Sequence, residues 1–390
     1  MNAIIRMQGW SHSKFGKLDD LSLEGLVEQV TEDAITNAGL DPHQIDEVFV
    51  SHYNHGLSEQ GFPASLPISA VPQLRNKPAT HVENACASGS AAVHQAARSI
   101  QAGEAKSVLV IGVEKMTDVS HDTVRHALIA ASHVPTEGQG QASFAGLFAQ
   151  MAQAYFEKYG DHSEALARIA AKNHSYGSQN PLAHMQRDLG FDFCFNTSEK
   201  NPVVAAPLKR TDCSMVSDGA AALVLTDGSF SGGQMADIRL RSKSHVSEML
   251  PLQGRDITKL EGCSRAWKQA LQRGGVELDD LDFIETHDCF TIAELLQYEA
   301  MGLAEEGRGA DVLKEGDSSL GGRMPTNLSG GLKSKGHPIG ATGVSMHIMA
   351  ARQLAGDACG VSLDNARLGG VFNMGGAGVA NYCSILERLS

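Results

Sequence analysis

The sequence predicts an α/β fold in which helices cover a mostly parallel sheet, and in which two similar halves make up the chain. Two observations predict the layering: apolar residues at helical spacing alternate along the chain with short apolar runs that are typical of buried strands. A third observation, an internal repeat, predicts the duplication.

The first predicted helix runs from Leu21 to Ala38, because its apolar residues recur at intervals of three and four. Gly39 follows where a C-terminal cap is needed, and the strand-like run IDEVFVSHY comes next. Three later runs, SVLVIGVE, AALVLTDG and LGGVFNMGG, are apolar enough for strands that are buried on both faces. We therefore expect helices on both faces of the sheet.

The repeat joins the segment from Ala34 to His52 (AITNAGLDPHQIDEVFVSH) with the segment from Ala270 to Asp288 (ALQRGGVELDDLDFIETHD). Each segment has the pattern of a helix end, a glycine cap, a turn and a strand. In the same order, CASGSAA, which begins at Cys86, aligns with HPIGATG, which begins at His337. Two matches in the same order favour duplication over chance.

We expect two domains. Residues 1–245 form an N-terminal half that includes a loop and lid insert at about 115–215, and residues 246–390 form a C-terminal half. Cys86 and His337 would then occupy equivalent helix starts beyond the carboxyl ends of strands, where such sheets bind ligands. The two halves would present both residues to one shared cleft.

Composition excludes several classes of function. The net charge is −13 and no basic stripe is present, so we expect no nucleic-acid partner. Seven cysteines without a Cys-x-x-Cys pair indicate reduced thiols rather than a disulfide framework. The start lacks a secretion signal and no apolar run is long enough for a membrane span, so we expect a cytoplasmic protein.

Cys86 is the first candidate for chemistry, because it precedes a run of small residues that predicts a tightly packed helix. Exposed amide hydrogens and the helix dipole at a helix start favour a negative charge, so a thiol there loses its proton more easily. Free cysteines are also often buried and inert. Both interpretations of Cys86 remain open on this stretch alone.

His337 stands in the string Gly336-His-Pro-Ile-Gly-Ala-Thr-Gly343, where Pro338 suits the first turn of a helix. An imidazole held at such a turn can accept a proton from a thiol or donate a hydrogen bond to a carbonyl oxygen. A single histidine is more often structural, but the density of glycine and proline around this one favours a functional turn.

These stretches together resemble the thiolase family. The resemblance rests on Cys86-Ala-Ser-Gly89, Gly336-His-Pro338 and the glycine-rich Asn373-Met-Gly-Gly-Ala-Gly378, in that order, and on Ser217 to Leu225, which looks like the strand that closes the family's N-terminal half. It covers essentially the whole chain. It implies the duplicated αβαβα layers of thiolases and acyl transfer between coenzyme A thioesters by Claisen condensation or thiolytic cleavage.

Two departures from the family pattern occur together. Most thiolases have Asn-Glu-Ala-Phe where this chain has His287-Asp-Cys-Phe290, and a Cys-x-Gly motif where this chain has Asn373-Met-Gly375. This exchange is similar to the sterol-carrier-protein-type thiolases. From the residues alone, the HDCF stretch could also form a zinc site, a disulfide or a plain turn, but no cluster of partner ligands is evident for zinc.

The resemblance implies a role for each site residue. Cys86 would be the nucleophile, His337 the base that accepts its proton, and Cys289 the second acid/base. His287 and His337 would form one oxyanion site, and the backbone N–H groups of Cys86 and Gly375 the other. Asn373 would polarise the site or fill space. We expect neither a metal nor a cofactor, because coenzyme A is a substrate.

Cations are needed for the phosphates of coenzyme A, and the candidates are Lys209 and Arg210, with Lys243 and Ser244 after the insert. The five remaining cysteines are interpreted as structural: Cys194, Cys213, Cys263, Cys359 and Cys383.

The resemblance also implies a homodimer or homotetramer, and relatives of this type can work beside a small OB-fold, zinc-ribbon protein. Two rival hypotheses are an acyl-CoA-binding scaffold subunit that serves such a partner, and a condensing enzyme that uses acyl carrier protein.

Overall fold

The computed structural model describes residues 4–139, 143–230 and 237–389. Its strands are β1 (Arg6–His12), β2 (Glu47–Ser51), β3 (Ala79–Val82), β4 (Ser107–Glu114), β5 (Val203–Ala205), β6 (Leu208–Lys209), β7 (Gly219–Thr226), β8 (Ile238–Ser247), β9 (Phe283–Glu285), β10 (Leu368–Gly375) and β11 (Ala380–Arg388).

The α-helices are α1 (Leu23–Asn37), α2 (Leu66–Ala70), α3 (Ser88–Ala102), α4 (His121–Ile129), α5 (Val134–Glu137), α6 (Phe144–Tyr159), α7 (Ser163–Gly177), α8 (Gly190–Phe195), α9 (Glu261–Gly274), α10 (Thr291–Ala300), α11 (Gly309–Lys314), α12 (Gly331–Lys335) and α13 (Ile339–Ala355). Short 3-10 turns occur at 42–44, 63–65, 72–74, 210–212 and 278–280.

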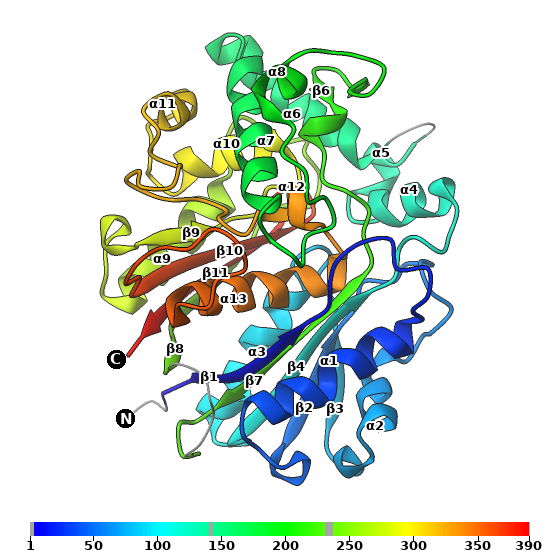
Figure 1. The fold of residues 1–390 in the computed structure, drawn as a ribbon. Helices are drawn as coiled ribbons and strands as arrows, with labels where there is room; N and C mark the ends of the chain where they lie inside the picture. Colours follow the sequence, from blue (N-terminus) through cyan, green and yellow to red (C-terminus); the bar gives the residue numbers. More distant parts are fainter. Residues whose placement is uncertain (1–3, 140–142, 231–236, 390) are drawn as a thin grey trace.

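The large sheet has the order β3-β2-β4-β7-β1-β8-β11-β10-β9, and this order is nearly mirrored about its centre (Figure 1). On one side of the centre β1 is followed by β7, β4 and β2, and on the other β8 is followed by β11, β10 and β9. Only two residue pairs join β1 to β8, so the two sides meet along a short seam.

The sheet is mixed rather than mostly parallel, which corrects the sequence prediction. Parallel pairing occurs between β2 and β3, β2 and β4, and β9 and β10, whereas β7 and β11 run antiparallel to their neighbours. The reason is that β4, β7 and β10 are buried on both faces by helices. A strand that is buried on both faces has a continuous apolar sequence whether it pairs with parallel or with antiparallel neighbours.

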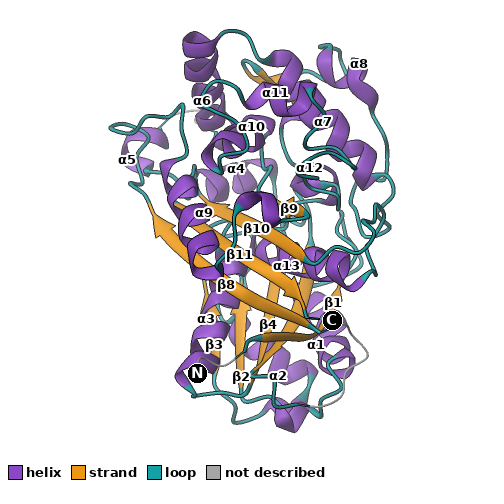
Figure 2. Ribbon diagram, turned by 90° about the vertical axis from the view of Figure 1, so that its left-hand side faces the viewer, coloured by secondary structure: helices purple, strands orange, loops and turns teal. Residues whose placement is uncertain are grey.

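Helices and strands form five layers, which confirms the predicted αβαβα architecture. Helix α1 packs on β1, β7 and β4, and α13 packs on β4, β7 and β10. Helices α3 and α13 lie together in the middle layer, and α9 covers β8 and β11 from outside. Figure 2 shows the strands of the sheet side by side between these helices.

The two aligned segments of the repeat have the same local structure. Gly39 and Gly275 both adopt a positive φ after α1 and α9, at +68° and +61°. A capped 3-10 turn and then a strand follow each glycine. The predicted domain boundary at residue 245 falls within β8 and remains a prediction.

The segment at 115–215 is more helical than the sequence suggested. It contains α4, α5, α6, α7 and α8, and α6 and α7 have 16 and 15 residues. Phe144, Leu147, Met151 and Tyr155 of α6 are buried at helical spacing, so packing stabilises this helix. Within the described residues, no helix combines the length and the apolar character that crossing a bilayer requires.

Candidate active site

Cys86 lies in the turn that leads into α3. Ala85 adopts a positive φ of +49°, and Ser88 Oγ accepts a hydrogen bond of 2.8 Å from the backbone N–H of Asn84, so the turn is tightly fixed. The side chain is 5% exposed and lines a cavity of about 240 Å³. The predicted position before a helix is therefore correct, and Cys86 borders the cavity.

His337 lies in the loop between α12 and α13. Gly336 before it has a φ of +112°, and a Cβ there would lie 2.7 Å from Ser217 Oγ, so only glycine fits. Nδ1 of His337 lies 2.7 Å from Oγ1 of Thr342, one turn into α13. Burial lowers the pKa of His337 to about 3, so its imidazole is neutral at physiological pH.

His287 and Cys289 occupy the turn between β9 and α10. The side chain of Gln297 in α10 holds this turn, because it accepts a hydrogen bond from the N–H of His287 and donates one to its carbonyl oxygen. Both side chains are nearly fully buried. Burial lowers the pKa of His287 well below its ordinary value and raises that of Cys289 well above it.

The predicted catalytic residues converge although separate segments supply them. The Cys86 sulfur and one ring nitrogen each of His287 and His337 lie within 4.8 Å of one another, and the two imidazoles meet edge to face with centroids 5.2 Å apart. Cys289 lines the same cavity as Cys86 and His337. The imidazole of His337 and the thiols of Cys86 and Cys289 thus border one apolar space, and the imidazole of His287 lies against this group without lining the cavity.

Asp288 turns away from the cavity. Its carboxylate accepts hydrogen bonds from the backbone N–H groups of Leu332 and Lys333 at the start of α12 and from the amide of Asn173. The burial of this carboxyl and the nearby Glu294 raise its pKa to about 7. These contacts give Asp288 a role in fixing the loop rather than in the chemistry.

Asn373 and the glycines after it lie at the end of β10, against the turn that carries Cys86. Nδ2 of Asn373 lies 3.0 Å from the carbonyl oxygen of Cys86 and 2.9 Å from Nδ1 of His287. A Cβ on Gly375 would lie 2.4 Å from the carbonyl oxygen of Asn84, so the strand end approaches the turn that carries Cys86 too closely for any side chain. The N–H that contacts the Cys86 sulfur belongs to Gly376, beside the expected Gly375.

Burial outweighs the helix start in setting the pKa of Cys86. Burial raises this pKa to about 12, although the N–H groups of Gly376 and of Cys86 itself lower it in part. The sequence led us to expect a thiol that loses its proton easily. Because the surroundings are apolar, the thiol keeps its proton until a base accepts it.

The residues predicted to hold the phosphates do not line the cavity. Lys209 is buried and pairs with Asp212 at 3.4 Å, and Ser244 is buried and donates to the carbonyl oxygen of Ala266. Arg210 is exposed, and Lys243 lies on β8, where burial, Arg98 and Arg273 lower its pKa to about 8. The cation that does line the cavity is Arg125 of α4, and His121 of the same helix also lines it.

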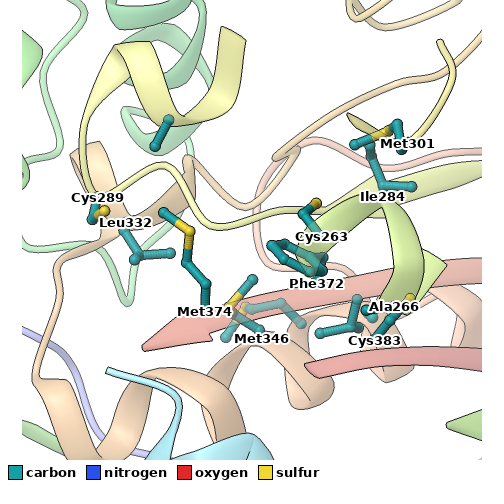
Figure 3. Close-up of a cluster of buried hydrophobic side chains, with 14 of the residues drawn as sticks. Cys263, Ala266, Ile284, Cys289, Met301, Leu332, Met346, Phe372, Met374 and Cys383 are labelled. Carbon is teal, nitrogen blue, oxygen red and sulfur yellow. The ribbon is translucent and has the colours of Figure 1, made fainter. Parts of the chain in front are cut away.

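Sequence reasoning also missed Cys213, which lines the cavity together with Cys86 and Cys289. An isolated β-bridge between Cys213 and Phe290 brings it there, and no local pattern signals such a long-range contact. Cys263 and Cys383, in contrast, lie in the apolar core beside Phe372 (Figure 3), as expected for structural cysteines. Cys194 and Cys359 are also buried.

The chain matches two family models that together span most of its length. The model described as "Thiolase, N-terminal domain" matches residues 6–229, and the model described as "Thiolase C-terminal domain-like" matches residues 243–388. An acetyl-CoA acetyltransferase of Methanothermobacter thermautotrophicus is 33% identical over 98% of this chain and 99% of that protein. Sterol carrier protein 2 of Homo sapiens is 31% identical over 90% of this chain and 65% of that protein.

Solved structures share the fold. The structure of the "Ltp2-ChsH2(DUF35) aldolase" superimposes with a TM-score of 0.83 at 21% identity, over 99% of this chain and 98% of that chain. An acetyl-CoA acetyltransferase from Syntrophomonas wolfei has a TM-score of 0.72 at 18% identity and full coverage of both chains. At these identities the likeness establishes the architecture.

Proposed function

Because this chain belongs to the thiolase family, we propose that it transfers acyl groups between coenzyme A thioesters through an acyl intermediate on Cys86, as an acetyl-CoA acetyltransferase does. The observation that carries this proposal is the convergence of the Cys86 sulfur, His287 and His337 within 4.8 Å beside a cavity that Cys289 also lines. The chemistry uses these side chains and coenzyme A thioesters alone.

In the first step the free ring nitrogen of His337 accepts the proton of Cys86, and the sulfur attacks the thioester carbonyl. A hydrogen bond from His287 stabilises the negative charge that develops on the carbonyl oxygen. When the intermediate collapses, the carbon–sulfur bond to coenzyme A breaks, and the leaving thiolate takes a proton from Cys289. The products are acyl-Cys86, free coenzyme A, a Cys289 thiolate and a protonated His337.

In the second step that thiolate removes a proton from the α-carbon of a second acetyl-CoA. The resulting carbanion attacks the carbonyl carbon of acyl-Cys86, so a carbon–carbon bond forms and the bond to sulfur breaks. The N–H groups of Cys86 and Gly376 are placed to stabilise the charge on that carbonyl oxygen, with Gly375 providing the close approach. The Cys86 sulfur then recovers its proton from His337.

Arg125 replaces the earlier candidates as the cation for the phosphates of coenzyme A, with His121 as a second polar side chain on the cavity wall. Both lie on α4 at the cavity wall, and the side chain of Arg125 is 25% exposed, so its guanidinium can reach a phosphate without leaving its helix. Apolar residues line the rest of the wall and suit the pantetheine and acyl portions: Met116, Val124, Leu128, Phe144, Met215 and Phe290.

We further propose that the protein acts as a homodimer or homotetramer in the cytoplasm, where its seven unpaired cysteines remain reduced. The similar Ltp2-ChsH2(DUF35) aldolase is a protein with a second component, which supports a partner protein here as well, and the family resemblance implies that this partner is a small OB-fold, zinc-ribbon protein. The complete set of Cys86, Cys289 and His337 favours an enzyme over a scaffold subunit. Light scattering, and turnover measured with and without a candidate partner, test these assignments.

The proposed function is tested by mass spectrometry of the protein after exposure to acetyl-CoA. We expect one acetyl group on Cys86 in the wild type and none in Cys86→Ala. The variant Cys289→Ala should still form acetyl-Cys86 but should lose condensation. Acetylation elsewhere would refute the nucleophile assignment, and normal condensation by Cys289→Ala would refute the second acid/base.

A further inference from the structure

We propose that Asn373 is a positioning residue that fixes His287 in the tautomer with its proton on Nε2, while Thr342 fixes the opposite tautomer in His337. The proposal rests on the proposed function, because it explains how two neighbouring imidazoles perform different tasks there. Neither Asn373 nor Thr342 needs to touch the substrate for this role.

The orientation of the Asn373 amide follows from its contact with the nucleophile. A backbone carbonyl oxygen can only accept, so the group 3.0 Å from the carbonyl oxygen of Cys86 must be the NH₂. The same nitrogen lies 2.9 Å from Nδ1 of His287, and it has a second hydrogen to donate there. Nδ1 of His287 is therefore an acceptor, and the proton of the neutral ring is on Nε2.

The opposite argument applies to His337. Oγ1 of Thr342 lies 2.8 Å from the carbonyl oxygen of Pro338 and donates its single hydrogen to it. The hydroxyl oxygen is then an acceptor for Nδ1 of His337 at 2.7 Å, so the proton of that ring is on Nδ1. Its Nε2 keeps a lone pair, which is what a base for the Cys86 thiol requires.

The tautomers matter because both rings are neutral. Burial lowers the pKa of each, so each ring has one N–H and one lone pair to place. The ionisable groups around His287 are the thiols of Cys86 and Cys289 and the imidazole of His337; α10 and β10 contribute the uncharged Gln297 and Asn373. Both amides already donate their hydrogens to other acceptors, and neutral His337 presents a lone pair, so the thioester oxygen finds no N–H among these groups if His287 presents its lone pair as well.

The position of Asn373 also explains why an amide stands there. This side chain must donate both to the backbone carbonyl oxygen of Cys86 and to the imidazole of His287. A primary amide can do so because it has two hydrogens on one nitrogen atom. A thiol at this position, as in the Cys-x-Gly pattern of most thiolases, has only one hydrogen. The amide thereby joins the nucleophile turn to the turn that carries His287.

The test replaces Asn373 by aspartate, which has the same shape but cannot donate. The carboxylate accepts the proton of Nδ1, so neutral His287 then presents a lone pair to the substrate, and only the doubly protonated ring offers an N–H. We measure the rate of acetyl-Cys86 formation in a single turnover from about pH 6 to about pH 8.5. Loss of one oxyanion donor should slow Asn373→Asp by about 100-fold at about pH 8.

The decisive readout is the ratio of the variant rate to the wild-type rate. This ratio should rise at least about tenfold from about pH 8 to about pH 6, because the new carboxylate beside Nδ1 raises the pKa of His287 and lets the ring gain its second proton in this range. Asn201→Asp is the matched control, since Asn201 is a buried asparagine that donates to the backbone around α8, away from the cavity. Its ratio to the wild type should not depend on pH. A pH-independent ratio for Asn373→Asp would overturn the tautomer proposal.

Failure of the wild type to form acetyl-Cys86 would instead refute the proposed function. If Asn373→Asp does not fold, ¹⁵N NMR of histidine-labelled wild type reads the tautomers directly, with His287→Gln and His337→Gln to assign the signals. We expect the proton on Nε2 of His287 and on Nδ1 of His337. The same tautomer in both rings would contradict the proposal.

Discussion

Oδ1 of Asp288 accepts a hydrogen bond of 2.6 Å from the backbone N–H of Leu332, and this contact joins the turn that carries Cys289 to the short helix that leads to His337. The second carboxylate oxygen contacts the N–H of Lys333 at 3.2 Å and the amide of Asn173 at 2.7 Å. Gly331 has a φ of +57°, and a Cβ there would lie 2.2 Å from this carboxylate. One buried carboxylate thus fixes two segments of the active site relative to each other.

Asp288→Ala should lower both stability and activity. Three donors would lose their buried acceptor, at a cost of about 1–3 kcal/mol for each group left unpaired, and His337 would no longer be fixed relative to Cys289. We expect a free energy of unfolding lower by at least about 3 kcal/mol in urea titrations and a kcat reduced by at least roughly tenfold.

Asp41→Ala is the control for this variant, because Asp41 accepts an N–H at the start of an exposed 3-10 turn. It should cost about 1 kcal/mol and leave kcat unchanged. If Asp288→Ala were as stable and as active as Asp41→Ala, the joining role of Asp288 would be wrong.

The sequence could predict the catalytic turns because glycine and proline mark them locally. Cys86, His337 and the HDCF turn all stand at element starts that short stretches define. The sequence could not predict which cations face the cavity, because Lys209 pairs with Asp212 and Arg125 reaches the wall only through the placement of α4. The contacts of Asn373 were equally hidden, since its partners are 86 and 287 residues away.

A buried histidine pair between α3, α13 and β11 should make stability depend on pH. Nδ1 of His347 donates to the carbonyl oxygen of Gly343, so its Nε2 accepts from the Ser384 hydroxyl, and Ser384 Oγ in turn accepts the Nε2 proton of His94. Burial lowers the pKa of His347 to about 4 and that of His94 well below its ordinary value.

Below about pH 6.5 the unfolded chain binds protons at these histidines while the folded chain does not, so their contribution makes unfolding easier as pH falls. Each depressed histidine contributes up to about 1.4 kcal/mol per pH unit in this window. We expect His94→Gln, whose amide can still donate to Ser384, to reduce the loss of unfolding free energy between about pH 6.5 and about pH 5. The reduction should be at most about 1.4 kcal/mol per pH unit, which is the contribution of one histidine. Urea titrations at several pH values measure this, and identical slopes for variant and wild type would contradict it.

Arg125 should matter for binding coenzyme A and not for the chemistry. Arg125→Ala removes a cation from the cavity wall, so the KM for acetyl-CoA should rise roughly three- to tenfold, or about 1 kcal/mol, at unchanged kcat. The KM for an acetyl-pantetheine thioester, which has no phosphate, should not change. Arg210→Ala is the control, since Arg210 is exposed and does not line the cavity. An equal effect on both substrates would exclude phosphate contact.

The close approach of α3 and α13 should make Gly89 irreplaceable. A Cβ on Gly89 would lie 2.6 Å from the backbone nitrogen of Val344 and 2.7 Å from that of Gly343, and backbone atoms in a packed middle layer cannot move aside cheaply. Because α3 begins just after Cys86 and α13 just after His337, any separation of these helices also moves the nucleophile from its base. Gly89→Ala should therefore destabilise the protein by about 3 kcal/mol or more and slow acylation of Cys86.

Gly25 provides the matched substitution. A Cβ there would meet only side chains, at 3.6 Å or more. Gly25 also lies within the helix α1. Gly25→Ala should therefore stabilise the protein by about 0.5–1 kcal/mol, because alanine has the higher helix propensity. Urea unfolding measures the change in the free energy of unfolding for both variants. Opposite signs for Gly89→Ala and Gly25→Ala would distinguish the effect of close packing from the effect of backbone conformational freedom. A tolerated Gly89→Ala with full acylation would mean that the two helices can move apart without displacing Cys86 from His337.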